Sequence, residues 1–384
     1  MGPLKGLKVI EMAGIGPGPF CAMMLSDMGA EVLRIDRADA VGAKGERDPR
    51  FEVLNRGRPS IALDLKKPQA VETVRRLVQQ ADVLIEGFRP GVMERLGLGP
   101  EDCAKVNPKL VYGRITGWGQ DGPLSQAAGH DINYIAITGA LHAIGRAGGA
   151  PVPPLNLIGD FGGGSLYMLF GILCALWERE RSGKGQVVDA AIVDGVNSLS
   201  SFLFGALARK GWVNERGKNV LDGGRPWYDS YETKDGGYIC IGPIEARFYQ
   251  LFLEKVGLAD AGLPDQNDPA GWPVLRERFT ALFKTRTRDE WCALLESTDA
   301  CFAPVLSPLE APLHPHNVAR GNFTEVDGVL QPVPAPRFSR TKPEIAGPAS
   351  RAGQKTRAGL AQWGIPENEI QALIDDKVAI QAAV

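Results

Sequence analysis

The chain has 384 residues, of which 44% are hydrophobic and 23% are charged, and its formal net charge is −2. That composition predicts a globular protein of roughly two domains, and it gives no electrostatic reason to expect binding to a nucleic acid or to a membrane surface. The six cysteines form no Cys-x-x-Cys pair and have no histidine at metal-ligand spacing, so neither a metal site nor a disulfide framework is indicated.

We expect no targeting segment. The start, MGPLKGLKVIEMAG, lacks the basic segment and long apolar core of a secretory signal. We find no window with the roughly 18 apolar residues that a membrane span requires. The expected location is therefore cytoplasmic, or an organelle matrix if the source is eukaryotic, where thiols stay reduced.

The chain opens with a pattern typical of a βαβ unit. Residues 7–12 predict a buried strand, residues 20–28 a helix and residues 31–36 a second strand. The intervening loop, GIGPGP, is similar to the dinucleotide fingerprint, but its spacing is Gly-x-Gly-x-Gly, and Pro17 and Pro19 remove N–H donors that a pyrophosphate would need. A nicotinamide-dependent dehydrogenase is therefore the least favoured alternative.

Basic residues gather near the ends of the next predicted strands, which cover residues 60–66, 82–87 and 110–116. Cations at the carboxyl ends of parallel strands suit a ligand that carries phosphates, because ligands of open α/β sheets collect there. For any single arginine, a solvated basic face is the simpler interpretation. The basic residues are Arg37, Arg47, Arg50, Arg56, Arg58, Lys66, Arg89 and Arg95.

Residues 129–164 carry the densest group of reactive side chains. His130 is followed directly by Asp131, and Asp160 stands between a proline-rich approach and the glycine run 162–164. The glycines permit close backbone approach to a ligand, and the apolar run after Asp160 predicts a buried helix that starts there. His130 and Asp160 can both move protons. The alternatives are a structural histidine in the core and an aspartate that only caps the helix.

The second half of the chain predicts a smaller domain. The sequence predicts a strand at 185–195 and helical residues at 197–209. The pattern of residues changes near residue 222, where two predicted strands are joined by a Lys-Asp-Gly-Gly turn and are followed by a helix that begins at Glu245. Glu245 is also suited to cap that helix. The predicted organisation is a large domain of 1–195 to which 326–384 returns, linker helices at 196–221 and a small α+β domain at 222–325.

Several motifs along the chain together resemble the family III CoA-transferase superfamily. They include EGFRPGVMERLGLGP, TGWGQDGP, PVPPLNLIGDFGGGS and ERERSGKGQVVDAAIVDG. Within the superfamily, the combination of GHDINY with IGPIEARFY is similar to the branch of racemases that act on 2-methylacyl-CoA thioesters, which carries its histidine and its glutamate there. The GDFGGGS motif alone is shared by racemases and transferases.

The resemblance implies an α/β fold with a Rossmann-like large domain and a smaller α+β domain, in an interlocked homodimer. The active site is then expected between the large domain of one subunit and the small domain of the other. Acid–base roles are implied for His130 and Asp160, with Glu245 and Asp131 as orienting partners. Contacts to the CoA part of the substrate are implied for Arg37, Leu63, Asp64, Leu65, Lys66, Gly87, Phe88, Arg89, Arg95, Gly129, Ile132, Asn133 and Tyr134.

The chemistry expected of such a racemase needs neither a metal nor a redox cofactor, and CoA enters only as part of the substrate. A thioester acidifies its α-carbon, so one group removes that proton and another returns it from the opposite face. His130 and Asp160 are the expected pair. Backbone N–H groups of the helix after Asp160, or of the glycine run, would stabilise the enolate oxygen, and Glu245 of the second subunit would hydrogen-bond the imidazole.

Two other functions remain open. A family III CoA-transferase would use Asp160 as a nucleophile and form an acyl anhydride, whereas a CoA-thioester-binding protein would turn nothing over. The acyl chain itself is undefined, because the apolar residues suited to line its pocket are of common types. They are Ile15, Phe20, Tyr134, Leu221 and Trp227.

Overall fold

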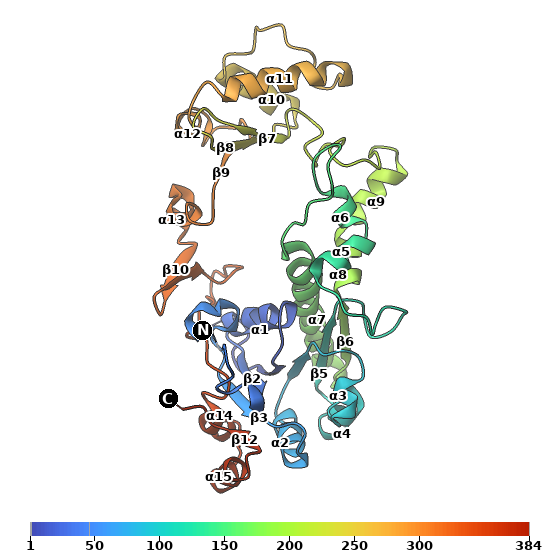
Figure 1. Cartoon of the computed structure of the whole chain (residues 1–384), viewed down its shortest axis with the longest axis vertical. Helices are drawn as coiled ribbons and strands as arrows, with labels where there is room; N and C mark the ends of the chain where they lie inside the picture. Colours follow the sequence, from blue (N-terminus) through green and yellow to red (C-terminus); the bar gives the residue numbers. More distant parts are fainter. Residues whose placement is uncertain (1, 46, 384) are drawn as a thin grey trace. The chain divides into compact units, whose positions relative to one another are not determined.

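The structure is a computed structural model that describes residues 2–45 and 47–383. They divide into two compact units (Figure 1). The first comprises Met1–Thr138, Leu155–Leu199 and Gly321–Val384, and the second comprises Gly139–Pro154 and Ser200–Arg320. The sequence places boundaries near residues 195, 221 and 325. It does not indicate the excursion of residues 139–154, which leave the first unit, join the second and return.

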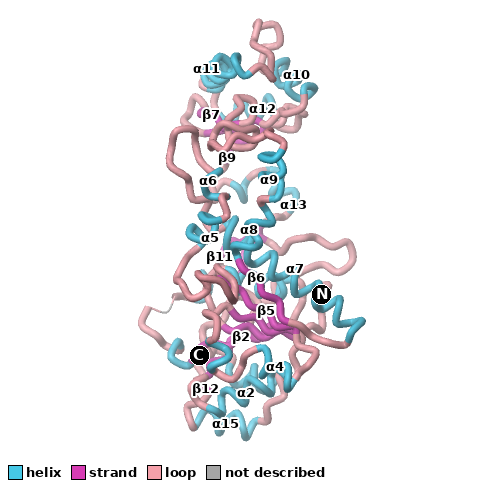
Figure 2. The backbone as a smooth tube through the Cα atoms, turned by 90° about the vertical axis from the view of Figure 1, so that its right-hand side faces the viewer, coloured by secondary structure: helices cyan, strands magenta, loops and turns pink. Residues whose placement is uncertain are grey.

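A seven-stranded sheet forms the centre of the first unit, in the order β12-β3-β2-β1-β4-β5-β6. Strands β1 to β6 run parallel, and β12 is antiparallel to β3. Figure 2 shows the strands of this sheet in magenta, with β2, β5 and β6 labelled. The order 3-2-1-4-5-6 is that of the doubly wound nucleotide-binding fold, so the predicted Rossmann-like α/β class is confirmed. The strands are β1 Lys8–Met12, β2 Glu31–Arg37, β3 Ser60–Leu63, β4 Val83–Glu86, β5 Val111–Thr116, β6 Val187–Ala191 and β12 Ala379–Ile380.

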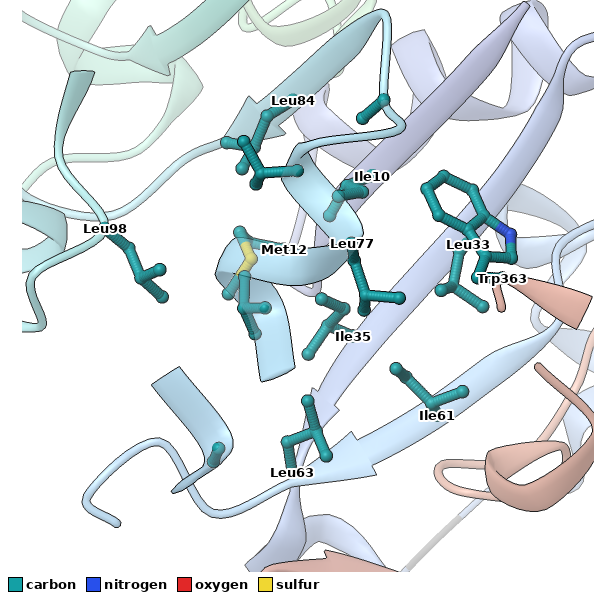
Figure 3. Close-up of a cluster of buried hydrophobic side chains, with 14 of the residues drawn as sticks. Ile10, Met12, Leu33, Ile35, Ile61, Leu63, Leu77, Leu84, Leu98 and Trp363 are labelled. Atoms are coloured by element: carbon teal, nitrogen blue, oxygen red, sulfur yellow. The ribbon is translucent and has the colours of Figure 1, made fainter. Parts of the chain in front are cut away.

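Alternate residues of these strands supply two separate cores, one on each face of the sheet. Ile10 and Leu33 belong to the cluster that α2, α14 and α15 cover, with Trp363 packed against it (Figure 3). Val9 and Val32, their neighbours in sequence, belong to the opposite cluster, under α1 and α7. Both faces are therefore apolar, which explains why the strands appear in the sequence as continuous hydrophobic runs.

The helices of the first unit begin where proline or glycine permits. Pro17, Pro68 and Pro100 occupy the first turns of α1, α2 and α4, where a missing N–H costs no hydrogen bond. The sequence placed the start of α1 later, at residue 20, because it assigned Pro17 to the preceding loop. The helices are α1 Pro17–Asp27, α2 Pro68–Val78, α3 Val92–Arg95, α4 Pro100–Val106, α5 Asp131–Ile137, α7 Tyr167–Ser182, α8 Ile192–Leu199, α14 Thr356–Gln362 and α15 Glu367–Asp375, with short 3₁₀ turns η1 Ala38–Ala40, η2 Pro49–Phe51 and η3 Val53–Asn55.

The helix expected to start after Asp160 is different in the structure. A π-helical segment, η4, spans Leu157–Leu166 and runs directly into α7, so Asp160 lies inside its first turn. The glycine run packs η4 against α8, since a methyl group on Gly163 would meet Val196 and one on Gly195 would strike the Gly163 carbonyl. These glycines serve helix packing. Nor is α7 fully buried, because it carries large exposed apolar side chains.

The continuous helical stretch Leu157–Ser182 is long and apolar enough to cross a membrane, judged by length and composition alone. Its 18-residue window has a mean hydropathy of 1.5, and 33% of that window is buried within this chain. We did not expect an apolar window of this length from the sequence, because we predicted that the helix begins only after Asp160. In the structure, η4 and α7 pack against α1, α8 and the sheet.

The last 64 residues belong to the first unit as an arm that returns to the sheet. After the antiparallel hairpin of β10 (Phe323–Val326) and β11 (Val329–Pro332), the arm ends in α14, α15 and β12. The buried side chain of Arg56 connects this arm to Asp27 at the end of α1. Its guanidinium donates to Asp27 Oδ2 at 2.6 Å, to Gln331 Oε1 at 2.9 Å and to the Pro332 carbonyl at 2.7 Å, in a nearly water-free site.

The second unit has its own core around a small antiparallel sheet, β7-β8-β9. The predicted hairpin and its following helix are confirmed by β7, β8 and α10, and aromatic rings such as Phe252 and Phe279, 5.4 Å apart, fill the interior. Its elements are α6 Ala140–Ala143, α9 Ser201–Ala208, β7 Asp229–Glu232, β8 Tyr238–Ile241, α10 Ala246–Lys255, η5 Pro269–Gly271, α11 Trp272–Phe283, α12 Arg288–Leu295, β9 Phe302–Val305, η6 Ala311–Leu313 and α13 Pro315–Arg320.

Replacing Arg56 should destabilise the first unit strongly. In Arg56→Ala the Asp27 carboxylate stays buried without its partner, which costs about 3–5 kcal/mol in the free energy of unfolding. Urea denaturation measures the loss. Arg47→Ala is the matched control, because its pair with Glu52 is exposed and is worth at most about 1 kcal/mol. Equal effects of the two substitutions would contradict this role of Arg56.

Candidate active site

A pocket of about 470 Å³ opens at the carboxyl ends of β4 and β5. Three segments of the first unit line it: the turn 87–90 after β4, the turn 116–118 after β5, and residues around His130 at the start of α5. Open parallel sheets bind ligands at this edge. The structure therefore places the predicted histidine beside the strand ends that the sequence marked for a phosphate-bearing ligand.

Glu86, the last residue of β4, fixes the turn that follows this strand. Its carboxylate is buried and accepts a hydrogen bond of 2.7 Å from the Phe88 N–H and one of 2.8 Å from Arg114 Nε. Burial raises the pKa of Glu86, while the donors from Phe88 and Arg114 favour its charged form. The result is a fixed turn that presents Phe88 and Arg89 to the pocket.

His130 occupies the N-cap position of α5, with extended backbone angles of φ −131° and ψ 174°. Its N–H donates to the Asn133 side-chain oxygen at 3.0 Å, and its carbonyl accepts from the Asn133 N–H at 2.8 Å. Tyr134 donates its hydroxyl to the Gly129 carbonyl. The imidazole lines the pocket and is solvent-exposed, so the interpretation of His130 as a buried core histidine is wrong.

Asp160 is tied to the residue next to His130. Its N–H donates to Asp131 Oδ1 at 2.7 Å. Gly159, the residue before Asp160, makes this hydrogen bond possible, because a methyl group at Gly159 would overlap Asp131 Oδ1. Asn156 donates to Asp160 Oδ2 at 3.4 Å. The bond to Asp131, the residue after His130, thus ties the first turn of η4 to the start of α5.

Both aspartates hold protons more strongly than an exposed carboxyl group. The pKa of Asp160 is raised, mainly by burial and also by the charge of Asp131, whereas the Asn156 hydrogen bond and His130 act in the opposite direction. Burial likewise raises the pKa of Asp131, against the N–H groups of Asp160 and Gly159. A carboxyl group with a raised pKa is suited to exchange a proton near neutral pH.

The expectation that Asp160 is only a helix cap does not fit. The residue lies within the first turn of η4, and its carboxylate meets the Asn156 amide, with no capping hydrogen bond among the described residues. Glu245 in the second unit also makes no capping hydrogen bond with its side chain. It is the exposed N-cap residue of α10, but its carboxylate accepts no hydrogen bond from any residue that the structure describes. Both carboxylates are thus available for chemistry.

The residues predicted to bind CoA fall into two groups. The pocket that contains His130 is also lined by Gly87, Phe88, Arg89, Gly129, Asn133 and Tyr134. Ile132 and Arg95 lie outside that lining, with Ile132 on the exposed side of α5 and Arg95 at the end of α3. The structure thus gathers about half of the predicted CoA contacts around His130.

The other group lies at the carboxyl ends of β2 and β3. Arg37 pairs in register with Leu63, and it binds Asp39 through an exposed ion pair. The pKa of Asp39 is lowered by the Arg37 hydrogen bond and also by the charge of Lys66, which therefore stands nearby. Asp64 accepts the Lys66 N–H at 3.2 Å, and Leu65 packs against the core. Two basic side chains are thus available at this edge.

Arg56 and Arg58 are structural, contrary to their inclusion among the candidate phosphate ligands. Arg58 is buried against Glu11 with an Nε to Oε2 distance of 2.9 Å, and Arg56 is buried against Asp27. Their guanidinium groups cannot reach a ligand without leaving a buried carboxylate unpaired. Trp227 is also a core residue, since its Nε1 donates to the Gln266 carbonyl inside the second unit.

The sequence missed Asn156 and the turn after β5. Gly117 lets the Tyr134 ring pass over the backbone, where any larger side chain would collide with it, and the Trp118 ring meets Tyr134 edge-on at 4.8 Å. The motif TGWGQDGP marked this turn only as glycine-rich. For Asn156, its place four residues before Asp160 was a usable signal, because that spacing brings side chains together on a helical turn.

A doubly wound parallel sheet with a pocket at its carboxyl edge defines an α/β protein of the ligand-binding kind. Residues 4–356 match CoA-transferase family III, and the chain belongs to that family. The resemblance seen in the sequence is thereby confirmed.

Relatives cover nearly the whole chain. It is 46% identical to the alpha-methylacyl-CoA racemase of Mus musculus and 44% identical to that of Homo sapiens, with 98% of this chain and 97% of each relative aligned. It is 30% identical to the succinyl-CoA:glutarate CoA-transferase of Mus musculus, over 93% of this chain and 85% of that protein. A CAIB/BAIF family protein from Brucella suis has a similar structure, with a TM-score of 0.81, 27% identity, and coverage of 94% and 99% of the two chains.

Removing the Asn156 amide should raise the pKa of Asp160 further. In Asn156→Leu the carboxylate loses a donor that favours its charged form, so its titration should move to higher pH. NMR with ¹³C-labelled aspartate measures the shift. Asp189, whose pKa is raised by burial and is affected by Gln120 but not by Asn156, serves as the internal control. An unchanged Asp160 titration would show that the 3.4 Å contact has no electrostatic effect.

Proposed function

We propose that the protein is an isomerase that interconverts (2R)- and (2S)-2-methylacyl-CoA thioesters by moving the α-proton. The observation that carries this proposal is the proximity of an exposed His130, which lines the pocket, to a half-buried Asp160, whose backbone is bonded to the neighbouring Asp131 and whose carboxyl group feels the charge of His130. The two racemases that align over nearly the full chain support the same function.

The reaction requires one proton acceptor and one proton donor on opposite faces of the substrate. In the proposed mechanism His130 removes the α-proton from one epimer, the electron pair moves onto the thioester oxygen, and protonated Asp160 delivers a proton to the other face of the enolate. The reverse direction exchanges the two roles. The proton count balances in each direction, so the chemistry calls for no metal and no redox cofactor.

The raised pKa of Asp160 supports its role as the donor. A carboxyl group in water is almost fully ionised at neutral pH, whereas burial and the neighbouring Asp131 keep more of Asp160 protonated. Asp131 in turn acts as a positioning residue, because its Oδ1 fixes the Asp160 backbone. The N–H groups of Gly159 and Asp160 are directed to Asp131, so the donor for the enolate oxygen is to be sought elsewhere than in the first turn of η4.

We infer that CoA lies along the carboxyl edge of the sheet. Arg89 reaches the pocket beside His130, and Arg37 and Lys66 stand at the ends of β2 and β3. These cations suit the phosphates of CoA, while the pocket of His130 would take the thioester. On this proposal the protein acts in the cytoplasm, or in an organelle matrix if its source is eukaryotic.

We further infer a homodimer in which the second subunit completes the site. The last residue of η4 and helix α7 expose a row of apolar side chains at helical spacing, which favours burial against another protein surface. Glu245 has a free carboxylate at the start of α10, suited to orient an imidazole supplied by a partner chain. The row consists of Leu166, Phe170, Leu173 and Trp177.

The strongest alternative is a CoA-transferase with Asp160 as nucleophile, since the chain also has transferase relatives. In that reaction the carboxylate attacks the thioester, releases CoA as a thiolate and forms an anhydride, which an acceptor acid then resolves. Such turnover requires a second carboxylic acid. Hydroxylamine would trap the acyl group on Asp160 in a transferase and leave a racemase unmodified.

Single substitutions should separate the two proton-transfer steps. In deuterated buffer the unmodified enzyme should incorporate deuterium at the α-carbon of either epimer. With His130→Ala or Asp160→Asn, epimerisation should fall by about 10²–10⁴-fold, and each variant should keep exchange with one epimer only, because one acid–base group remains on one face. NMR of each epimer measures both rates.

CoA affinity and thermal stability serve as controls for these variants. Both should stay close to those of the unmodified protein, because His130 is exposed and Asp160 keeps its backbone hydrogen bond. Full epimerisation by both variants, or turnover that begins only after a free carboxylic acid is added, would contradict the proposed function.

Mixed dimers should test whether His130 and Glu245 act from different chains. His130→Ala and Glu245→Ala homodimers should both be slow. If each site takes its histidine from one chain and its glutamate from the other, a mixed dimer contains one intact site and one doubly altered site. Activity should therefore recover when differently tagged chains are co-expressed and purified through both tags. No recovery would indicate that the two residues act within one chain, or that they do not act together.

A further inference from the structure

The second unit contains a basic cavity that the proposed reaction does not use. It has a volume of about 570 Å³ and lies between the loop 217–225, the excursion at residues 146–147 and the start of α11. Four cations line it, with two carboxylates among them. The cations are Arg146, Lys218, Arg225 and Arg276, and the carboxylates are Asp222 and Asp229.

Both carboxylates are already occupied. Asp229 is 5% exposed and binds Arg146 through one oxygen and Arg276 through the other. Asp222 accepts the N–H groups of Gly217 at 2.9 Å, of Asn219 at 2.8 Å and of Gly224 at 3.1 Å. These bonds close the loop upon itself. Neither carboxylate forms an ion pair or a hydrogen bond with the two remaining cations, Lys218 and Arg225, although the charge of Asp222 acts on Arg225 from a distance.

Arg225 is held in place without a carboxylate partner. Its guanidinium stacks on the Trp272 ring at 3.7 Å from the centroid, and Nη1 donates to the Lys218 carbonyl at 3.1 Å. Within the described part of the chain, Arg225 Nε and Nη2 and the Lys218 ammonium have no hydrogen-bond acceptor. A stacked guanidinium keeps its donors in one plane, so they are already oriented for a ligand.

The loop is shaped to bring its backbone close to the cavity. Gly217 and Gly223 have φ values of 68° and 82°, which favour glycine. A methyl group on Gly223 would lie 3.0 Å from Arg146 Nη1, and one on Gly224 would collide with the Asn219 N–H. Side chains at these positions would fill the space that the cations surround.

We propose that this cavity is a binding site for a compact oxyanion, with a phosphate group as its ligand. A phosphate dianion matches the two cations that lack a carboxylate, and its oxygens suit the planar donors of Arg225 together with the mobile ammonium of Lys218. The guanidinium of Arg225, stacked on Trp272, and the glycine loop form one wall of the cavity, which at about 570 Å³ has room for a phosphate group and for the organic part of a phosphomonoester. The phosphate belongs either to free inorganic phosphate or to a phosphomonoester.

The site also bears on the excursion between the two proton-transfer groups. Arg146 belongs to that excursion, which leaves the end of α5 and returns just before Asn156 and Asp160. Arg216 binds it as well, through the carbonyls of His142 at 2.9 Å and Gly149 at 2.8 Å. An anion beside Arg146 would add one more attachment between the excursion and the second unit.

Isothermal titration of the full-length protein with inorganic phosphate tests the proposal, with glycerol phosphate and acetate as further ligands at constant ionic strength. One phosphate should bind per chain, and acetate should bind more weakly. Lys218→Ala and Arg225→Ala should each weaken phosphate binding by about tenfold, the loss expected for one charge-assisted contact. The tighter of phosphate and glycerol phosphate identifies the source of the group.

Two controls make the result decisive. Arg278→Ala removes an exposed cation from the same helix as Arg276 but outside the cavity, and it should leave the affinity unchanged. Arg89→Ala should also leave this site intact, because Arg89 lines the pocket of the first unit. Absence of saturable binding, or loss of binding in Arg89→Ala with retention in Lys218→Ala, would overturn the proposal. Lys218 is exposed, so its substitution should not affect folding.

Discussion

The hydrogen bond from the Asp160 N–H to Asp131 Oδ1 determines where His130 and Asp160, the two groups proposed to transfer the proton, stand. It joins segments 29 residues apart, and through it the start of α5, with His130, is fixed against the first turn of η4. A charge-assisted bond of this kind contributes about 1.5–3 kcal/mol. Gly159 is the condition for it, because any side chain there would occupy the place of the carboxylate oxygen. The glycine before Asp160 therefore has a role in the site, whereas the glycines after it serve the packing of η4 on α8.

Much of the fold could be predicted from the sequence, because the parallel strands are buried on both faces and appear as continuous apolar runs. The hairpin of β7 and β8 was equally visible, since a Lys-Asp-Gly-Gly turn separates two short strands. The π-helical start at Leu157 could not be predicted, because local propensity does not distinguish it from a loop that leads into an α-helix. The excursion 139–154 was also missed, since only its contacts in the second unit, such as that of Arg146 with Asp229, assign it there.

The sequence singled out His130 and Asp160 by residue type and glycine-rich surroundings, and the structure brings their segments together through the Asp131 hydrogen bond, while their catalytic roles stay a prediction. Charge was a poorer guide, since an arginine that is buried with a carboxylate looks the same in sequence as one that is open to a ligand. Arg58 lies against Glu11 and supports the sheet, whereas Arg89 lines the pocket. The difference depends on desolvation, because removing a buried guanidinium from its partner costs more than a surface contact with a phosphate returns. Only the three-dimensional structure shows whether a given arginine is buried with a carboxylate or is open to a ligand.

The path of the chain links the segments of His130 and Asp160 to the second unit. Helix α5 carries His130 and Asp131 at its start, and the chain then leaves for the second unit before it returns to Asn156 and Asp160. The excursion is anchored there by ionic contacts to Asp229 and by the Arg216 bonds to two carbonyls. The hydrogen bond between Asp131 and Asp160 closes the excursion at its base, because it joins two points of the first unit that lie on either side of residues 139–154.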